Sequence, residues 1–424
     1  MLNKYYKYKF MYLKNKNNQF GSAESKEENI SIEPRKCQID HFLCPNNTLN
    51  LGLCVRAGQD CDKDDIPEES YIPEINLEHL TEEEKKHYDD TITRSLRKGY
   101  IEDHLLETCN GVNLIREYDH EEYIIPDFFS IITLNIMGII RGDVNKYEFM
   151  KLRIKFLIEE IEKNQYPDIL CFQEMSKEVL DELYPPISHI YKFANYQIFE
   201  SDETIKPFII SKFIPIKTKL IELKGNLGYS NSIGIYEFRN LTIYNIYLQA
   251  GSINSLGQKY KWQHYSRCRI QELNYLKKLL LEETKPYIVL GDFNFDLNDD
   301  GSIFPEINVL KSIELNDSFK DIHPGDSGLT ENTDINTLRW NDKFEEKHYR
   351  YDAILYKNLQ PTNSILFANN GKKMTCLEDN IIYEKIFVPN KENSNLRINK
   401  KIGEQNYYDL FISDHFGVLS NFSF

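Results

Sequence analysis

The stretch Tyr287–Leu297 reads YIVLGDFNFDL and joins a strand-like run to a group of polar residues. Its first four residues, Tyr287–Leu290, are apolar or aromatic and favour a buried strand. Asp292 and Asn294 follow Gly291 at alternate positions, and alternate residues of an extended backbone point the same way. The chain therefore places a carboxylate and a carboxamide on one side of a strand end. Because Gly, Asp and Asn also form turns, this stretch alone supports chemistry and a plain polar turn about equally.

Other predicted strands end in polar residues in the same way. The residues concerned are Asn135 after the run 128–134, Glu174 after 168–172, Tyr247 within 241–248, Arg350 and Asp352 on one side of 349–356, and Asp414 and His415 after 411–412. Each of these residues by itself is more often structural than catalytic. Their number at strand ends favours one shared site, since α/β sheets carry their chemistry at strand ends.

The order of the predicted elements favours two packed mixed sheets flanked by helices. Apolar residues recur at helical spacing in 146–163 and 265–283, while strand-like runs cover 207–215, 232–238 and 416–422. Several strands follow each other without an intervening helix. A doubly wound parallel sheet would instead require regular alternation of strands and helices.

The N-terminal third differs in composition from the remainder of the 424-residue chain. Residues 1–36 are polar, with five lysines and no acid in 1–20, and we expect them to be disordered. Residues 37–125 form a predicted acidic accessory segment without a catalytic constellation, and residues 1–125 are a candidate surface for a protein partner. Its four cysteines, Cys37, Cys44, Cys54 and Cys61, are too widely spaced for a typical zinc knuckle. Two disulfides, a loose metal site and free thiols are equally supported.

Composition also narrows the functional class. No apolar run approaches the ~20 residues of a membrane span, and the N-terminus lacks the apolar core of a signal peptide. We therefore expect a soluble intracellular protein, and we expect a monomer. The net charge is −15, and residues 126–424 are mildly acidic. Non-specific binding to nucleic acid through net charge is thus not indicated.

Six stretches together resemble the endonuclease/exonuclease/phosphatase superfamily, which has the deoxyribonuclease-I-like fold. They are LNIMG (134–138), DILCFQE (168–174), IYLQAG (246–251), GDFN (291–294), RYDAIL (350–355) and SDHFGV (413–418), in the family's order. The resemblance covers residues 126–424. It implies a four-layer α/β sandwich and divalent-metal-dependent hydrolysis of phosphate esters.

The resemblance also implies roles for individual residues. Glu174 would be the main Mg²⁺ ligand with Asn135 beside it and Asp414 near the metal, and Mn²⁺ is an alternative ion. Asp292 would activate the attacking water and Asn294 would hold the water or the phosphate. His415, oriented by Asp352, would bind a phosphoryl oxygen. Arg350 is a further candidate for binding substrate phosphate.

Two features depart from the usual family pattern. Many members carry a histidine where this chain has Tyr247, although abasic-site endonucleases resemble it in having tyrosine there. Tyr247 either contacts phosphate through its hydroxyl or is a plain strand aromatic. Between RYDAIL and SDH lie 57 residues. Because this connection is longer than usual, residues 358–408 are predicted to hold an insertion.

The leading functional hypothesis is a metal-dependent phosphodiesterase acting on nucleic acid, either a nuclease or an enzyme of DNA ends or abasic sites. Tyr247 and an aromatic loop at 260–262, which could stack bases, favour it. The alternative is a phosphoinositide phosphatase or lipid phosphodiesterase, which suits the mildly acidic domain. A third hypothesis is an inactive binding module, against which the nearly complete set of site residues argues.

Overall fold

The computed structural model describes residues 41–43, 54–56, 114–117, 124–138, 144–199, 205–223, 231–251, 259–343, 346–374, 400–402 and 405–424. The chain divides into two compact units, Met1–His79 and Leu80–Phe424. In the first unit the description covers one antiparallel pair, β1 (His41–Leu43) with β2 (Cys54–Arg56). The predicted disorder of 1–36 and the state of the four cysteine side chains lie outside the described residues.

Two mixed sheets form the centre of the second unit. The larger sheet has seven strands in the order β12 (Asn316–Asp317), β15 (Asp352–Lys357), β11 (Tyr287–Asp292), β10 (Thr242–Tyr247), β9 (Asn231–Glu237), β8 (Lys217–Leu223) and β3 (Leu114–Glu117). The smaller has six: β16 (Gln360–Phe367), β21 (Gly417–Ser423), β4 (Phe128–Asn135), β5 (Ile169–Met175), β7 (Lys206–Ser211) and β6 (Phe193–Ala194). Pairs β10/β11 and β4/β5 are parallel and the other pairs are antiparallel.

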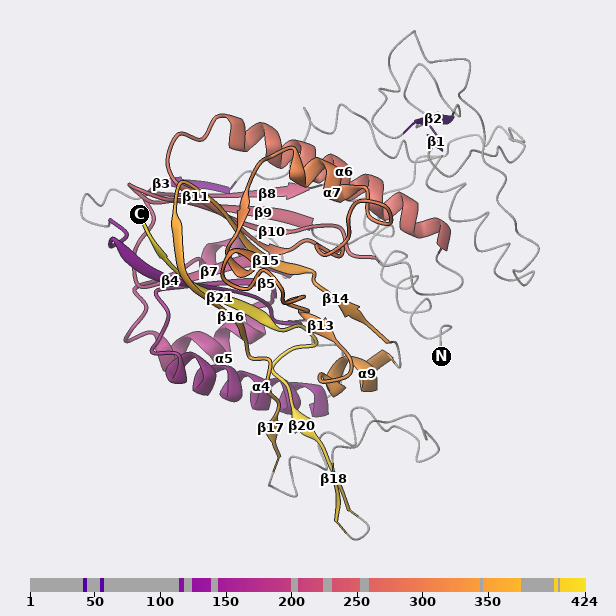
Figure 1. Ribbon diagram of the computed structural model, residues 1–424. Coiled ribbons are helices and arrows are strands. Elements are labelled where there is room, and N and C mark those ends of the chain that lie inside the picture. Colours follow the sequence, from indigo (N-terminus) through magenta and orange to yellow (C-terminus); the bar gives the residue numbers. More distant parts are fainter. Residues whose placement is uncertain are drawn as a thin grey trace, which may run out of the picture. The chain divides into compact units, whose positions relative to one another are not determined.

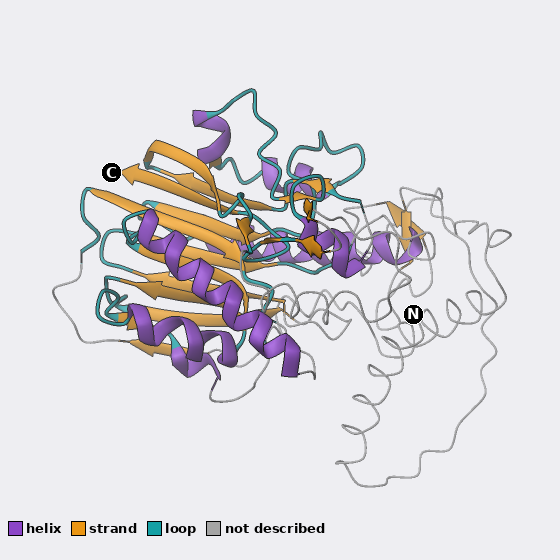
Figure 2. Ribbon diagram, turned by 90° about the horizontal axis from the view of Figure 1, so that it is seen from below, coloured by secondary structure: helices purple, strands orange, loops and turns teal. Residues whose placement is uncertain are grey.

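Helices cover the outer faces of both sheets (Figures 1 and 2). Helices α4 (Val144–Lys163) and α5 (Lys177–Ile187) pack on the six-stranded sheet through one apolar cluster. Helices α6 (Lys259–Leu281) and α7 (Glu306–Lys311) pack on the seven-stranded sheet through a second cluster. A third cluster joins the two inner faces, with Ile131 and Ile209 from one sheet and Ile243 and Leu290 from the other. The predicted four-layer α/β sandwich is confirmed.

Shorter elements connect the strands. They are η1 (Tyr196–Phe199), α8 (Ser318–Ile322), α9 (Thr337–Lys343) and the two-stranded pairs β13 (Glu331–Asn332) with β14 (His348–Tyr349), β17 (Lys372–Lys373) with β20 (Asp409–Leu410), and β18 (Lys400–Ile402) with β19 (Gln405–Tyr407). Figure 1 shows β13, β14 and α9 together beside the sandwich. Among the described residues, no helix is both long and apolar enough to cross a membrane.

A buried polar network joins the two sheets. Asn245 of β10 donates from Nδ2 to the carbonyl oxygens of Phe172 (3.1 Å) and Phe208 (3.0 Å) in the other sheet. The amide of Gln173 donates to Asn245 Oδ1 (2.7 Å) and to Thr133 Oγ1 (3.0 Å). Since buried polar groups need specific partners, this network fixes how the sheets are stacked.

Three segments differ from the expectation. Strand β3 lies within the predicted accessory segment 37–125 but pairs with β8. In the same segment, buried Ile125 donates from its backbone N–H to Asn240 Oδ1, and its carbonyl oxygen accepts from Asn240 Nδ2. Strand β16 lies within the predicted insertion 358–408 but is an integral strand of the six-stranded sheet. Of the rest of that segment, residues 375–399 lie outside the description. Residues 260–262 belong to helix α6 and do not form a loop.

Candidate active site

Strands from both sheets bring the predicted residues to one place. In the seven-stranded sheet Asp292 is the register partner of Tyr247 on one side and of Asp352 on the other. In the six-stranded sheet Asn135 ends β4 beside β5. Asn135 Nδ2 donates to Asp292 Oδ2 at 2.9 Å, which links the two sheets directly. The structure thus gathers Asn135, Glu174, Tyr247, Asp292, Asn294, Asp352 and His415 at one end of the sandwich.

Glu174 is held in an unusual backbone conformation. It lies in an irregularity of β5 between Phe172 and Met175, and its φ of 53° is in the left-handed region. Its Oε1 accepts hydrogen bonds from Tyr247 Oη (2.8 Å) and Asn135 Nδ2 (3.2 Å). Among the described residues no hydrogen bond reaches Oε2, and the side chain is partly exposed. Glu174 is therefore an oriented carboxylate with one oxygen available to a cation.

The hydrogen bonds refine two of the expected roles. Tyr247 is buried, and its hydroxyl contacts Glu174, so it orients the predicted metal ligand. The Asn135 carboxamide oxygen accepts from Met137 N at 3.0 Å, while its nitrogen faces the carboxylates of Glu174 and Asp292. In this orientation Asn135 also positions acidic groups.

Asp292 and Asn294 form one rigid unit after β11. Asn294 has a φ of 57°, which turns its backbone N–H toward Asp292 Oδ1 at 2.8 Å. Its side-chain nitrogen donates to the carbonyl oxygen of Leu248 at 2.9 Å. Non-glycine residues with positive φ are uncommon, and their occurrence at both Glu174 and Asn294 marks this region as conformationally strained.

Asp352 and His415 form a buried pair beside Asp292. His415 Nδ1 lies 2.8 Å from Asp352 Oδ2, and ligand atoms of Asp292, Asp352 and His415 all lie within 4.8 Å of one another. Burial by itself lowers the pKa of His415, but Asp352, Asp292 and Asp414 together raise it well above its usual value. Burial, with the adjacent charge of Asp352, raises the pKa of Asp292 to about 7. A carboxyl group of this kind is suited to exchanging a proton near neutral pH.

The expected role of Arg350 is not supported. Its side chain is buried, and the guanidinium makes two hydrogen bonds to Asp317, at 2.7 and 2.8 Å. The expected alternation of Arg350 and Asp352 fails because β14 ends at Tyr349 and β15 begins at Asp352. Arg350 lies in the break between these strands and serves the structure.

Asp414 is part of a cluster that strand ends did not reveal. Its Oδ2 accepts from Arg339 Nη1 at 2.8 Å, and Arg339 Nε lies 2.8 Å from Glu331 Oε1. Lys347 Nζ lies 3.3 Å from Glu331 Oε2. Burial opposes ionisation of Glu331, but Arg339, Lys347 and His415 together hold its pKa below the usual range. Because Glu331 belongs to a two-residue strand, no local sequence pattern indicated this cluster.

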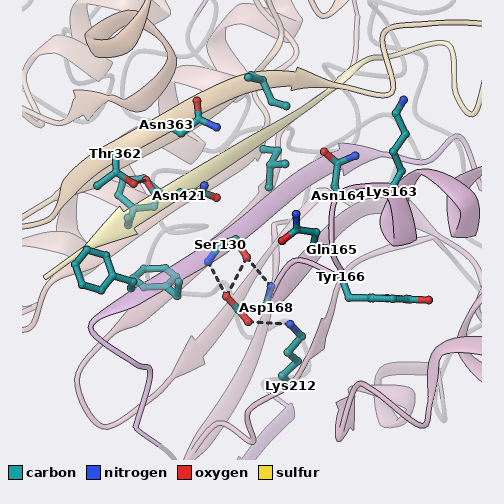
Figure 3. Close-up of a pocket in the computed structure, with 15 residues that line it drawn as sticks. Ser130, Lys163, Asn164, Gln165, Tyr166, Asp168, Lys212, Thr362, Asn363 and Asn421 are labelled. Atoms are coloured by element: carbon teal, nitrogen blue, oxygen red, sulfur yellow. Dashed lines mark hydrogen bonds and ion pairs between the residues drawn. The ribbon is translucent and has the colours of Figure 1, made fainter.

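Other groupings on the described surface are less suited to chemistry. Asp334, Glu346 and His348 lie close together but are exposed. A pocket of about 560 Å³ lies at the opposite ends of the strands, where Ser130 and Asp168 bond to each other and Lys212 pairs with Asp168 (Figure 3). This pocket contains none of the predicted site residues.

Comparison with known proteins agrees with the geometry. The model of the endonuclease/exonuclease/phosphatase family matches residues 132–365, more than half of the chain. The chain belongs to this family. At the level of the family, it is a hydrolase of the endonuclease/exonuclease/phosphatase type, and its sandwich is that of the deoxyribonuclease-I-like fold. No curated protein sequence matches the chain.

Solved structures resemble the chain at low sequence identity. Truncated TDP2 from Caenorhabditis elegans is 16% identical with a TM-score of 0.46, covering 70% of this chain and 98% of its own. TDP2 from D. rerio, complexed with single-strand DNA product, is 15% identical with a TM-score of 0.47, covering 70% of this chain and 100% of its own. SmcL is 13% identical with a TM-score of 0.49, covering 71% and 100%.

Proposed function

We propose that this protein is a divalent-metal-dependent phosphodiesterase that cleaves nucleic acid. The observation that carries the proposal is the continuous contact between Glu174, Asn135 and Asp292 across two sheets, with the Asp352–His415 pair beside it. This arrangement combines a candidate cation ligand, a proton acceptor and a donor to phosphate within one site.

Glu174 is the residue that would hold the ion, through its Oε2. Its free oxygen is a hard carboxylate donor, which suits Mg²⁺ and also Mn²⁺. A hard divalent ion bound there would polarise a phosphate oxygen and favour departure of the leaving oxygen. Tyr247 and Asn135 keep Oε1 occupied, so that the carboxylate presents its other oxygen in a fixed direction.

Asp292 is the residue proposed to accept the proton of the attacking water. Its pKa of about 7 makes the deprotonated form available near neutral pH, and Asn135 and the Asn294 backbone fix its direction. The Asn294 side chain is held at Leu248, at the end of β10 beside the same site.

His415 is proposed to donate a hydrogen bond from Nε2 to a phosphate oxygen. Asp352 holds the Nδ1 side of the ring at 2.8 Å, which leaves Nε2 for the substrate. The raised pKa of His415 keeps the ring protonated, so charge that grows on phosphate in the transition state meets a fixed positive group.

A substrate panel tests this function and separates it from the alternative. Wild type and Asp292→Asn are incubated with Mg²⁺ and single-stranded, duplex or abasic DNA, RNA, a phosphoinositide or sphingomyelin. We expect wild type to cleave a nucleic acid, and Asp292→Asn to lose at least ~100-fold in rate. Cleavage of a lipid or inositol phosphate alone would establish the alternative. Absence of all activity in wild type would favour an inactive binding module.

A further inference from the structure

A second acidic cluster lies next to the proposed catalytic groups. Ligand atoms of Glu331, Asp414 and His415 lie within 4.8 Å of one another, and all three residues are buried. Glu331 is fully buried, and among the described residues neither of its carboxylate oxygens accepts a hydrogen bond of normal geometry. A buried ionised carboxylate in this state requires a cation.

The chain itself supplies that cation. Arg339 on α9 places Nε 2.8 Å from Glu331 Oε1, in an ion-pair contact without hydrogen-bond direction. The same guanidinium donates from Nη1 to Asp414 Oδ2 at 2.8 Å. One planar group therefore bridges the two acids, as a divalent ion would bridge them.

Among the described residues, basic side chains already pair with both acids of this cluster. Glu331 and Asp414 face Arg339 and also Lys347, whose Nζ lies 3.3 Å from Glu331 Oε2. Arg153 and the ring of His415 lie close enough to interact electrostatically with Asp414. A divalent ion sharing these ligands would stand a few ångströms from several positive groups, where repulsion in a buried site is strong.

We propose that the guanidinium of Arg339 occupies the cation position of the Glu331–Asp414–His415 cluster and thereby excludes a second divalent ion. The protein then binds a single ion, at Glu174, which rests on the proposed function. Asp414 is paired with protein and is not a ligand of that ion. Arg339 provides a positive charge at Glu331 and Asp414 that does not depend on the metal concentration.

Counting bound Mn²⁺ in the full-length protein by electron paramagnetic resonance tests this inference without any substrate. We expect one ion in wild type, none in Glu174→Gln, and one additional ion in Arg339→Met. Arg339→Lys, which keeps the charge, gains none. Lys347→Met is the matched control and should bind one ion, as wild type does. It removes a basic partner of Glu331 but leaves the Arg339–Asp414 pair intact. The additional ion of Arg339→Met should disappear in Glu331→Gln/Arg339→Met.

Two results would overturn the inference. One is a second ion in wild type that Glu331→Gln removes, and this comparison holds even if Arg339→Met does not fold. The other is a folded Arg339→Met, judged by circular dichroism, with the same ion count as wild type. If wild type binds no ion while Arg339→Met binds one, the metal site at Glu174 fails and the role of Arg339 stands.

Discussion

At Gly138 the backbone after β4 passes against the backbone of Glu174. A Cβ atom at residue 138 would lie 2.0 Å from the carbonyl oxygen of Glu174 and 3.0 Å from Ser176 N. Glu174 already has a φ of 53°, so its backbone has little freedom to move away. Gly138 is thus required for the position of the proposed metal ligand, although it contributes no side chain.

Gly138→Ala should therefore damage the site through the backbone. We expect a loss of stability of about 1–3 kcal/mol and a fall in cleavage rate on the order of 10-fold to 100-fold, because Glu174 is displaced. Urea denaturation and steady-state kinetics measure the two effects. Gly325→Ala is the control, since a Cβ there meets no atom within 4 Å. Equal behaviour of the two variants would contradict this account.

Most site residues were predictable from the apolar run that precedes them in the sequence. Asp292 ends a buried strand and Asn294 follows it, and both lie in the site. His415 also lies in the site, although the predicted strand at 411–412 is not formed and β20 ends at Leu410. Arg350 was not predictable, because a break between two short strands changes its direction. The pairing of Asp414 with Arg339 joins residues 75 positions apart and therefore has no local signature.

Among the elements, helix α6 holds the segment after β10 in position through hydrogen bonds. Fully buried Arg269 donates from Nη1 to the carbonyl oxygens of Gln249 (2.9 Å) and Gly251 (3.0 Å). Glu272 accepts from Gln249 N at 2.9 Å and from Asn231 Nδ2 at 2.7 Å. Because Leu248 precedes this anchored turn and accepts from Asn294, α6 indirectly supports the site.

Glu272 should make stability depend on pH. Burial raises its pKa to about 7 from 4.5, and hydrogen bonds from Gln249 and Asn231 only partly oppose the shift. Between about pH 4.5 and pH 7, Glu272 is therefore protonated in the folded state and ionised in the unfolded state. The stabilising effect is complete below about pH 4.5 and is lost as the pH rises through about 7.

Comparison with Glu272→Gln isolates this contribution. Between pH 5 and pH 8, wild type should lose roughly 2–3 kcal/mol of unfolding free energy relative to the variant, which has no titrating group there. Urea denaturation at several pH values measures the difference, and other titrating groups cancel. Parallel pH profiles for the two proteins would show that Glu272 is ionised throughout.

Elements with strong periodicity were predictable, and others were hidden for physical reasons. Helix α4 has the expected apolar stripe, with Phe149, Leu157 and Ile161 buried against the sheet. Helix α5 was missed because Pro185 and Pro186 occupy its last turn, where proline normally indicates a helix end. Strand β13 has two residues and is defined by tertiary contacts alone.

At the scale of the molecule, the boundary of the catalytic unit lies earlier than composition indicates. Residues 21–125 carry 25 acids and 11 bases, which suggested one accessory segment. The second compact unit nevertheless begins at Leu80, and β3 at Leu114–Glu117 is the edge strand of the large sheet. Charge composition does not report such a strand, because pairing with β8 is made by the backbone.

Two truncations test this boundary. Deletion of residues 1–79 should leave the second unit folded, with a melting temperature close to that of the full chain. Deletion of 1–125 removes β3 and Ile125, exposes the edge of β8, and should lower the melting temperature by at least a few degrees. Equal melting temperatures for the two truncations would show that β3 contributes nothing to the sheet.

The most direct test of the proposed site is the Mg²⁺ dependence of cleavage of a single-stranded oligonucleotide, measured for wild type and Glu174→Gln. We predict that cleavage by wild type saturates with Mg²⁺ and is abolished by chelation. Glu174→Gln should need far more Mg²⁺ or remain inactive, while its melting temperature stays close to that of wild type. Cleavage by wild type that persists in excess chelator, or is unchanged in Glu174→Gln, would contradict the assignment of this strand-end cluster as a metal-dependent phosphodiesterase site.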